Sequence, residues 1–191
     1  MPQKWPEVEA TIQLDGVPRD LESAMALANR KDDKTRKEFE KWAVLTFSRN
    51  QARINEKKGA DGGVDGIAYF LLDKDTNGKA IFQVKSRPGT REDLAKLNSD
   101  RQREKAEFGF LICTGPFPIG RAMQKEIDAA GKYKHPMLNR EDDRLQVVYV
   151  ADLFTTPNKP ARLLDLPMAR ADAVKAARAL GDEGKQAALD L

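Results

Sequence analysis

The stretch that decides the fold is KKGADGGVDGIAYFLLDKDTNGKAIFQVKS, residues 57–86. It begins with a glycine-rich segment, which disfavours a helix, and continues with a mostly apolar run over residues 64–72. The polar segment 73–78 contains the Asn77-Gly78 pair that favours a β-hairpin, and residues 79–86 are again rich in apolar side chains. The stretch therefore predicts two antiparallel strands joined by a turn.

The register of this hairpin determines which polar side chains share a face, because side chains alternate between the two faces of a sheet. A turn centred on Asp75 would place Asp65 opposite Lys85. The same turn would place Ile67 opposite Gln83, so that the polar groups lie together. The other face would then be apolar and suited to burial: Ala68, Phe70, Phe82 and Val84.

The polar face of the hairpin carries residue types suited to a metal ion and a phosphate. The Asp65 carboxylate is a hard oxygen ligand of the kind that Mg²⁺ prefers, and the Gln83 amide and the Val84 backbone carbonyl offer further oxygens. Lys85 would place a positive charge beside an attacking water and a scissile phosphate. This layout indicates a metal-dependent nuclease. The alternative is a solvated face of an edge strand, in which Asp61 or Asp65 caps a turn.

The rest of the chain alternates helices and strands. Apolar spacing predicts helices at about 20–28, 35–48, 91–104 and 119–130, strands at 108–113 and 145–150, and a polar loop at 132–144. This order is typical of an α/β protein with a central mixed β-sheet flanked by helices. We expect three parts: an N-terminal arm at 1–19, the sheet-containing domain at 20–156, and a C-terminal helical tail at 157–191 with a helix near 169–180.

Composition limits the remaining possibilities. A chain of 191 residues, 40% hydrophobic, is long enough for one well-buried core. Its net charge of +3 is too small to indicate nucleic-acid binding by itself, so that argument depends on where the charges lie. The single cysteine, Cys113, is predicted to be a core residue and favours a reducing, cytoplasmic setting. Neither a signal peptide nor a membrane span is expected. The lone His135 lies in the predicted polar loop and is assigned no role.

Segment 62–66 together with Gln83-Val84-Lys85 resembles the Mrr-like branch of the PD-(D/E)XK restriction endonuclease superfamily, in which glutamine replaces the middle acid. Other segments resemble a domain found at the C-terminus of many bacterial DNA methyltransferases. These segments cover roughly residues 13–154: Gly16 to Glu22, Phe39 to Ala43, Lys57 to Asp61, Arg103 to Ala106 and Leu145 to Val147.

The resemblance implies a restriction-endonuclease-like fold and Mg²⁺-dependent cleavage of DNA, with Mn²⁺ as a substitute. Asp65 matches the metal-binding acid, Gln83 the substituted second ligand and Lys85 the catalytic lysine. Glu40 matches the helix glutamate that completes the metal site. The methyltransferase motifs Asp-Pro-Pro-Tyr, Asn-Pro-Pro-Tyr and Phe-x-Gly-x-Gly are absent. We therefore expect an excised domain or a free-standing relative, acting alone or beside a methyltransferase module.

Glu40 has two interpretations on its predicted helix. Its neighbours Phe39 and Ala43 belong to an apolar stripe, which places Glu40 near the buried side, where an unpaired carboxylate is costly and a metal would remove the cost. The alternative is a solvated Glu40 paired with Arg36 one turn earlier.

Basic residues flank the hairpin and could neutralise phosphates along a duplex. Double-strand cleavage by a single-site domain would require two copies, such as a homodimer, but the sequence itself does not give the oligomeric state. Two other interpretations remain open: a DNA-binding module that no longer cuts, and a protein-interaction domain that docks through its tail. The candidate DNA contacts are Arg53, Lys57, Lys58, Arg87 and Arg91.

Overall fold

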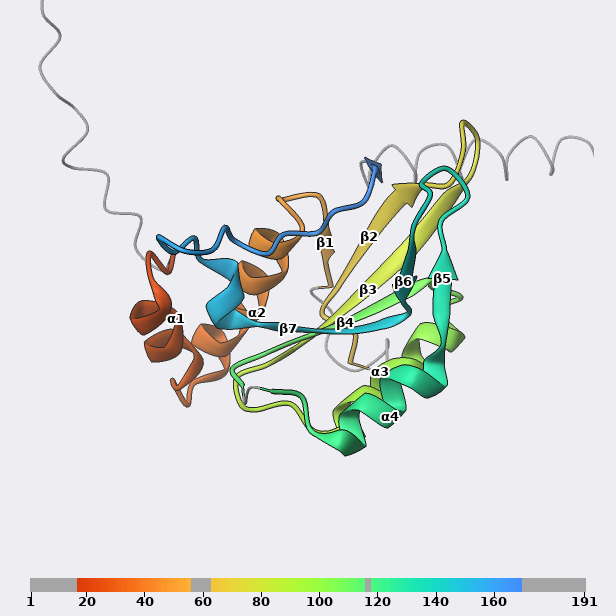
Figure 1. Ribbon diagram of the computed structural model, residues 1–191. Coiled ribbons are helices and arrows are strands. Elements are labelled where there is room, and N and C mark those ends of the chain that lie inside the picture. Colours follow the sequence, from red (N-terminus) through yellow and green to blue (C-terminus); the bar gives the residue numbers. More distant parts are fainter. Residues whose placement is uncertain (1–16, 56–62, 116–117, 170–191) are drawn as a thin grey trace, which may run out of the picture.

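The computed structural model describes residues 17–55, 63–115 and 118–169, and these form a mixed β-sheet covered by helices on both faces (Figure 1). The strand order is β1-β2-β3-β4-β7, with β8 paired to β2. β2 runs antiparallel to β1, β3 and β8, whereas β3, β4 and β7 are parallel. The predicted α/β class with a mixed, helix-flanked sheet is confirmed.

The elements follow the predicted order with three additions. The helices are α1 (Leu21–Ala28), α2 (Asp33–Phe47), α3 (Arg91–Arg103), α4 (Arg121–Ala130) and the 3-10 helix η1 (Val150–Leu153). The strands are β1 (Arg53–Ile54), β2 (Gly66–Leu71), β3 (Asn77–Lys85), β4 (Phe108–Cys113), β5 (Lys132–Lys134), β6 (Glu141–Asp143), β7 (Leu145–Tyr149) and β8 (Met168–Ala169). Strands β1 and β8 and the β5–β6 hairpin were not predicted, because segments of two or three residues carry too little periodicity to be recognised.

Each face of the sheet has its own apolar core. Helix α2 brings Phe39, Val44 and Phe47 onto the face that carries Phe82 and Phe110, and α1 adds Ala24 and Ala28 to the same core. Helices α3 and α4, which connect the parallel strands β3, β4 and β7, cover the other face (Figure 1). That second core contains Leu94 and Leu97 of α3, Met123 and Ile127 of α4, and Ile81, Leu111 and Val147 of the sheet.

The predicted register of the β2–β3 hairpin is wrong by two positions. Gly66 pairs with Phe82 and Leu71 with Asn77, two positions away from the pairing that a turn centred on Asp75 would give. The turn comprises residues 72–76 rather than a tighter loop, because the Asp73 carboxylate accepts the backbone N–H groups of residues 75 and 76 at 2.8 Å. Since the shift is even, Ile67, Gln83 and Lys85 keep the same strand parity, whereas Asp65 lies where the ladder is distorted and faces Phe82 together with Gly66.

Gly78 explains why the longer turn is preferred. It pairs with Phe70, and a Cβ on Gly78 would lie only 2.4 Å from Cζ of that ring. Only glycine leaves space for the ring at this position of the pair. The Asn77-Gly78 dipeptide therefore belongs to β3 and is not the turn.

The segment after η1 packs against the domain as an extended chain. Leu164 is buried and its backbone N–H donates to the Phe47 carbonyl, while β8 pairs with the outer part of β2. The described part of the predicted helical tail, residues 157–169, is thus extended rather than helical. The helix predicted near 169–180 and most of the arm at 1–19 lie outside the described residues.

His135 is a core residue, which corrects the expectation of an uninvolved loop histidine. It is 2% exposed and its ring lies 5.8 Å from that of Phe70. Its Nδ1 accepts the backbone N–H groups of Met137 and Leu138, which closes the turn between β5 and β6. Its role is structural.

Candidate active site

The site is assembled by the start of β2, the end of β3 and the middle of α2. Asp65 directly precedes β2, Gln83 and Lys85 lie near the end of β3, and Glu40 lies on α2. The backbone N–H of Asp65 donates to the Phe82 carbonyl, although Gly66 is the residue that pairs with Phe82. Two residues of one strand thus face one residue of the other, as in a β-bulge, which can redirect a side chain at the edge of a site.

The Asp65 carboxylate is fixed by the neighbouring strand. Its Oδ2 accepts the backbone N–H of Val84 at 2.7 Å. Burial raises the pKa of Asp65 above its ordinary value, and this effect outweighs the Val84 N–H and the positive charges of Lys85 and Lys96, which act in the opposite direction. A bound cation would relieve the cost of this half-buried negative charge.

Glu40 combines features of both interpretations. It is partly buried, and its Oε1 lies 3.9 Å from Nε of Arg36, so the predicted ion pair within α2 exists. Burial, followed by the negative charge of Asp65, raises the pKa of Glu40, while Arg36 and Lys85 lower it. The negative charge of Asp65 thus opposes ionisation of Glu40, and a cation bound near both carboxylates would offset that cost.

The hydrogen bonding of the Gln83 side chain tests whether a metal ion fits this site. It is 1% exposed, and its Nε2 donates to the Gly63 carbonyl at 3.2 Å. Its Oε1 is buried and accepts no hydrogen bond within the described residues. A buried amide oxygen without a donor is costly, and a hard cation would satisfy it. Asp65, Glu40 and Gln83 together therefore fit a divalent metal.

The donor set is small. The described residues contain no group of three or more His, Cys, Asp and Glu side chains that could hold a metal. Two carboxylates and one amide would leave several coordination positions for water and substrate, which is the way Mg²⁺ is commonly bound. The Val84 carbonyl, also predicted as a ligand, remains a prediction.

Two lysines act on the carboxylates. Lys85, which was predicted, lowers the pKa of both Glu40 and Asp65. Lys96 on α3, which was not predicted, also lowers the pKa of Asp65. In the sequence Lys96 is flanked by Glu92 and Asp100 at i, i+4 spacing, which is typical of a surface ion pair, so the pattern gave no signal of a site residue.

The candidate DNA contacts differ in whether their basic side chains already bind a carboxylate of the protein. Arg53 lies exposed on β1. Arg87 makes a bidentate pair with Asp93, at 2.8 and 2.9 Å, and Arg91 donates to Glu126 at 2.8 Å. These two guanidinium groups hold α3 in place, which reduces their freedom to follow a phosphate. Lys57 and Lys58 lie outside the described residues.

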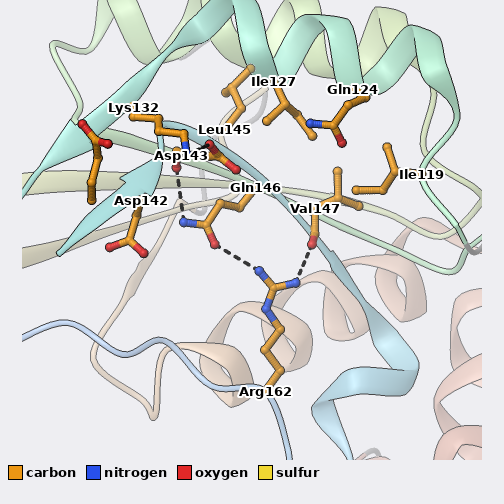
Figure 2. A pocket seen from close by; sticks show the side chains of 11 residues that line it. Ile119, Gln124, Ile127, Lys132, Asp142, Asp143, Leu145, Gln146, Val147 and Arg162 are labelled. Atoms are coloured by element: carbon orange, nitrogen blue, oxygen red, sulfur yellow. Dashed lines mark hydrogen bonds and ion pairs between the residues drawn. The ribbon is translucent and has the colours of Figure 1, made fainter.

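A pocket of about 280 Å³ lies elsewhere, between α4, β6 and β7 (Figure 2). Within it Arg162 donates to the Val147 carbonyl at 2.7 Å and to Gln146 Oε1 at 3.0 Å. These bonds tie the chain after η1 to β7, the last strand of the main sheet order. None of the predicted site residues lines this pocket, so we assign it a structural role.

A mixed sheet with helices on both faces, and two acids, an amide and a lysine at β2, β3 and α2, is the arrangement expected of a nuclease domain of the restriction-endonuclease type. A family model described as restriction endonuclease, Mrr_cat, matches residues 32–131, just over half of the 191 residues. The chain belongs to this family. The matched range contains all four site residues and extends from the start of α2 to the end of α4.

No curated protein and no solved structure matches the chain. None of the helices in the described ranges combines the length and apolarity needed to cross a membrane.

Proposed function

We propose that this protein is a divalent-metal-dependent DNA endonuclease whose site consists of Asp65, Glu40, Gln83 and Lys85. The observation that carries the proposal is the buried Oε1 of Gln83, which accepts no hydrogen bond in the part of the chain that the structure describes. Strand β3, which carries Gln83, adjoins two partly buried acids with raised pKa values. Those features are unfavourable in the protein alone and favourable around a cation.

The roles follow from the chemistry of each side chain. Asp65, Glu40 and Gln83, with the Val84 carbonyl as a further donor, would hold Mg²⁺ or Mn²⁺. When bound, the ion supplies an activated water and positive charge at the phosphate. Lys85 contributes a proton donor and a fixed positive charge toward the negative charge that develops on the phosphate. The Val84 N–H holds the Asp65 carboxylate in one orientation throughout.

The setting we propose is a restriction-modification system in the cytoplasm, with DNA as the substrate and a methyltransferase as the associated enzyme. Cleavage of both strands would use a homodimer. Arg53, Lys57 and Lys58 are the proposed phosphate contacts, with Arg87 and Arg91 in a secondary position because their guanidinium groups already have carboxylate partners.

The test is cleavage of methylated, unmethylated and branched duplexes by the full chain with Mg²⁺, Mn²⁺ or EDTA. We expect metal-dependent strand breaks that Asp65→Asn and Lys85→Ala each reduce by about 100-fold or more. Exposed residues outside the site provide matched controls, Asp75→Asn and Lys125→Ala, and these should cut like the wild type. Intact DNA under every condition would disprove the enzyme.

One observation favours a second candidate, a DNA-binding module that does not cut. Gln83 contributes no negative charge, so the site has only two acids with which to attract a metal. This candidate predicts salt-sensitive DNA binding that survives Asp65→Ala and Lys85→Ala, together with DNA that stays intact.

A further inference from the structure

Lys96 of α3 reaches the corner of the site formed by Gly63 and Gln83. A Cβ placed on Gly63 would lie 3.2 Å from Lys96 Nζ and 3.5 Å from Gln83 Nε2. Gly63 has a φ of +94°, a conformation that glycine adopts readily and other residues rarely do. The missing side chain at Gly63 therefore leaves room for the lysine beside the buried glutamine.

The Lys96 ammonium has no ion-pair or hydrogen-bond partner within the described residues. Its helical neighbour Asp100 instead accepts from Arg103 at 2.7 Å, and among the described residues Glu92 makes no ion pair with Lys96. The ammonium is close enough to Asp65 to lower the pKa of that carboxyl, with Lys85 acting more strongly in the same direction. A lysine whose surface partners are unused and whose charge faces the site is available for an anionic ligand.

The charge balance of the site gives this lysine a role. Asp65 and Glu40 supply two negative charges, whereas Gln83 supplies an uncharged oxygen. The site therefore attracts metal ions less strongly than a site with three acids would. A DNA phosphate brings another negative charge to this corner. Lys85 and Lys96 can neutralise the charge of the phosphate in place of additional metal ions, which two acids attract only weakly.

We propose that Lys96 is a second substrate-contacting lysine, which binds the phosphate held at the Asp65–Gln83 corner and acts together with Lys85. The proposal rests on the proposed nuclease function and adds a residue to the same site. Gly63 is then a positioning residue, since a Cβ there would lie only 3.2 Å from Lys96 Nζ and would crowd the ammonium.

The test measures DNA binding and cleavage separately, using the full chain. Binding of a fluorescent duplex is followed in Ca²⁺ between about 50 and 200 mM salt, and single-turnover cleavage in Mg²⁺. Because each phosphate contact adds about 0.9 to the slope of log K against log salt, Lys96→Ala should lower that slope by about 0.9. The cleavage rate should fall by about 10- to 100-fold, the range expected for loss of one charge-stabilising donor.

Two further variants make the result specific. Lys96→Arg keeps the positive charge and should retain the wild-type slope. Lys125→Ala removes another exposed lysine, on α4, and should change neither the slope nor the rate. Thermal unfolding of all variants checks that each is folded.

The outcomes separate the two proposals. Wild-type slope and rate in Lys96→Ala would overturn the Lys96 contact and leave the nuclease proposal intact. Binding without cleavage by the wild type would overturn the nuclease proposal, and the slope of Lys96→Ala would still decide the contact. A wild type that binds no DNA would overturn both.

Discussion

The backbone N–H of Val84 donates to Asp65 Oδ2 at 2.7 Å, so a residue of β3 fixes the acid that precedes β2. The contact links the two strands at the point where the ladder is distorted, since residues 65 and 66 both face Phe82. The Val84 residue is 3% exposed, so its N–H depends on this carboxylate for a partner. Asp65 is therefore part of the structure as well as of the site.

Because of this hydrogen bond, two substitutions of Asp65 should have different effects on stability. Asp65→Asn retains an oxygen that can accept the Val84 N–H and removes a charge that is costly to bury, so its metal-free stability should equal or exceed that of the wild type. Asp65→Ala leaves the N–H unpaired and should cost about 1–3 kcal/mol. Both should abolish cleavage. Urea denaturation in EDTA measures the difference, and equal destabilisation of the two variants would contradict the proposed role of the hydrogen bond.

The substitution Gln83→Glu should make the stability of the protein depend more strongly on bound metal. The substitution adds a third carboxylate near Asp65 and Glu40, whose pKa values are already raised, so we expect lower stability in EDTA by about 1–3 kcal/mol. Added Mg²⁺ or Mn²⁺ should reverse this and raise the melting temperature more than in the wild type, because binding to the native state stabilises it. Calorimetric melting with and without metal measures the effect.

The matched control for this charge change is Gln124→Glu, an exposed position on α4. It should leave the metal-dependent shift of the melting temperature at its wild-type size. A similar shift in both variants would show that the metal acts on net charge rather than at Gln83.

Asp93 should make the protein sensitive to acid. Burial raises the pKa of Asp93, but its hydrogen bonds to Arg87 and Thr90 outweigh burial and hold the pKa below the usual 3.8. The native state therefore binds this proton less readily than the unfolded state. Its contribution to stability is present above about pH 3.8 and is lost as the pH falls through the lower native pKa.

Asp93→Asn removes that contribution and weakens the capping box at the start of α3. We expect a loss of about 1 kcal/mol at neutral pH, a discounted value because Arg87 is half-exposed. The difference from the wild type should shrink below about pH 3.8, as denaturation series at several pH values would show. Glu92→Gln, an exposed change in the same helical turn, should show no such convergence.

Arg53 and Arg87 should differ when DNA binding and stability are measured together. Arg53→Ala removes an exposed side chain from β1 and should lower the salt slope of DNA binding by about 0.9 without changing the melting temperature. Arg87→Ala breaks the Asp93 pair and should lower the melting temperature as well. If Arg53→Ala leaves the salt slope of DNA binding unchanged, Arg53 does not contact DNA.

The sequence was sufficient for the larger elements because their apolar spacing is strong. The continuous run of β4 gives its bounds directly, and the stripe through Phe39 and Phe47 identifies the buried side of α2. Gln83 and Lys85 could be grouped from strand parity alone, since an even error in register leaves the parity unchanged. The position of Asp65 beside them depends also on the distortion of the ladder at residues 65 and 66, which the sequence pattern did not show.

What the sequence could not provide depended on contacts between distant residues. Asn77-Gly78 is a favourable turn pair, and only the Phe70 ring on the neighbouring strand shows why Gly78 belongs to β3 instead. Likewise, Lys96 resembles a surface residue until the fold brings α3 beside Gly63. In both cases local propensity was overridden by packing between segments.

Gly78 therefore provides a direct test of the observed register. An alanine Cβ at this position would lie 2.4 Å from Phe70 Cζ, so the ring or the strand must move, and Gly78→Ala should destabilise the protein by about 2–3 kcal/mol. Gly120→Ala is the matched control, because its added Cβ meets no atom within 4 Å and its φ of −69° suits alanine. Urea denaturation should show a small change for Gly120→Ala. In the register centred on Asp75, Gly78 would face Leu72 instead of the Phe70 ring, so a Gly78→Ala protein as stable as the Gly120→Ala control would favour that pairing and count against the one observed.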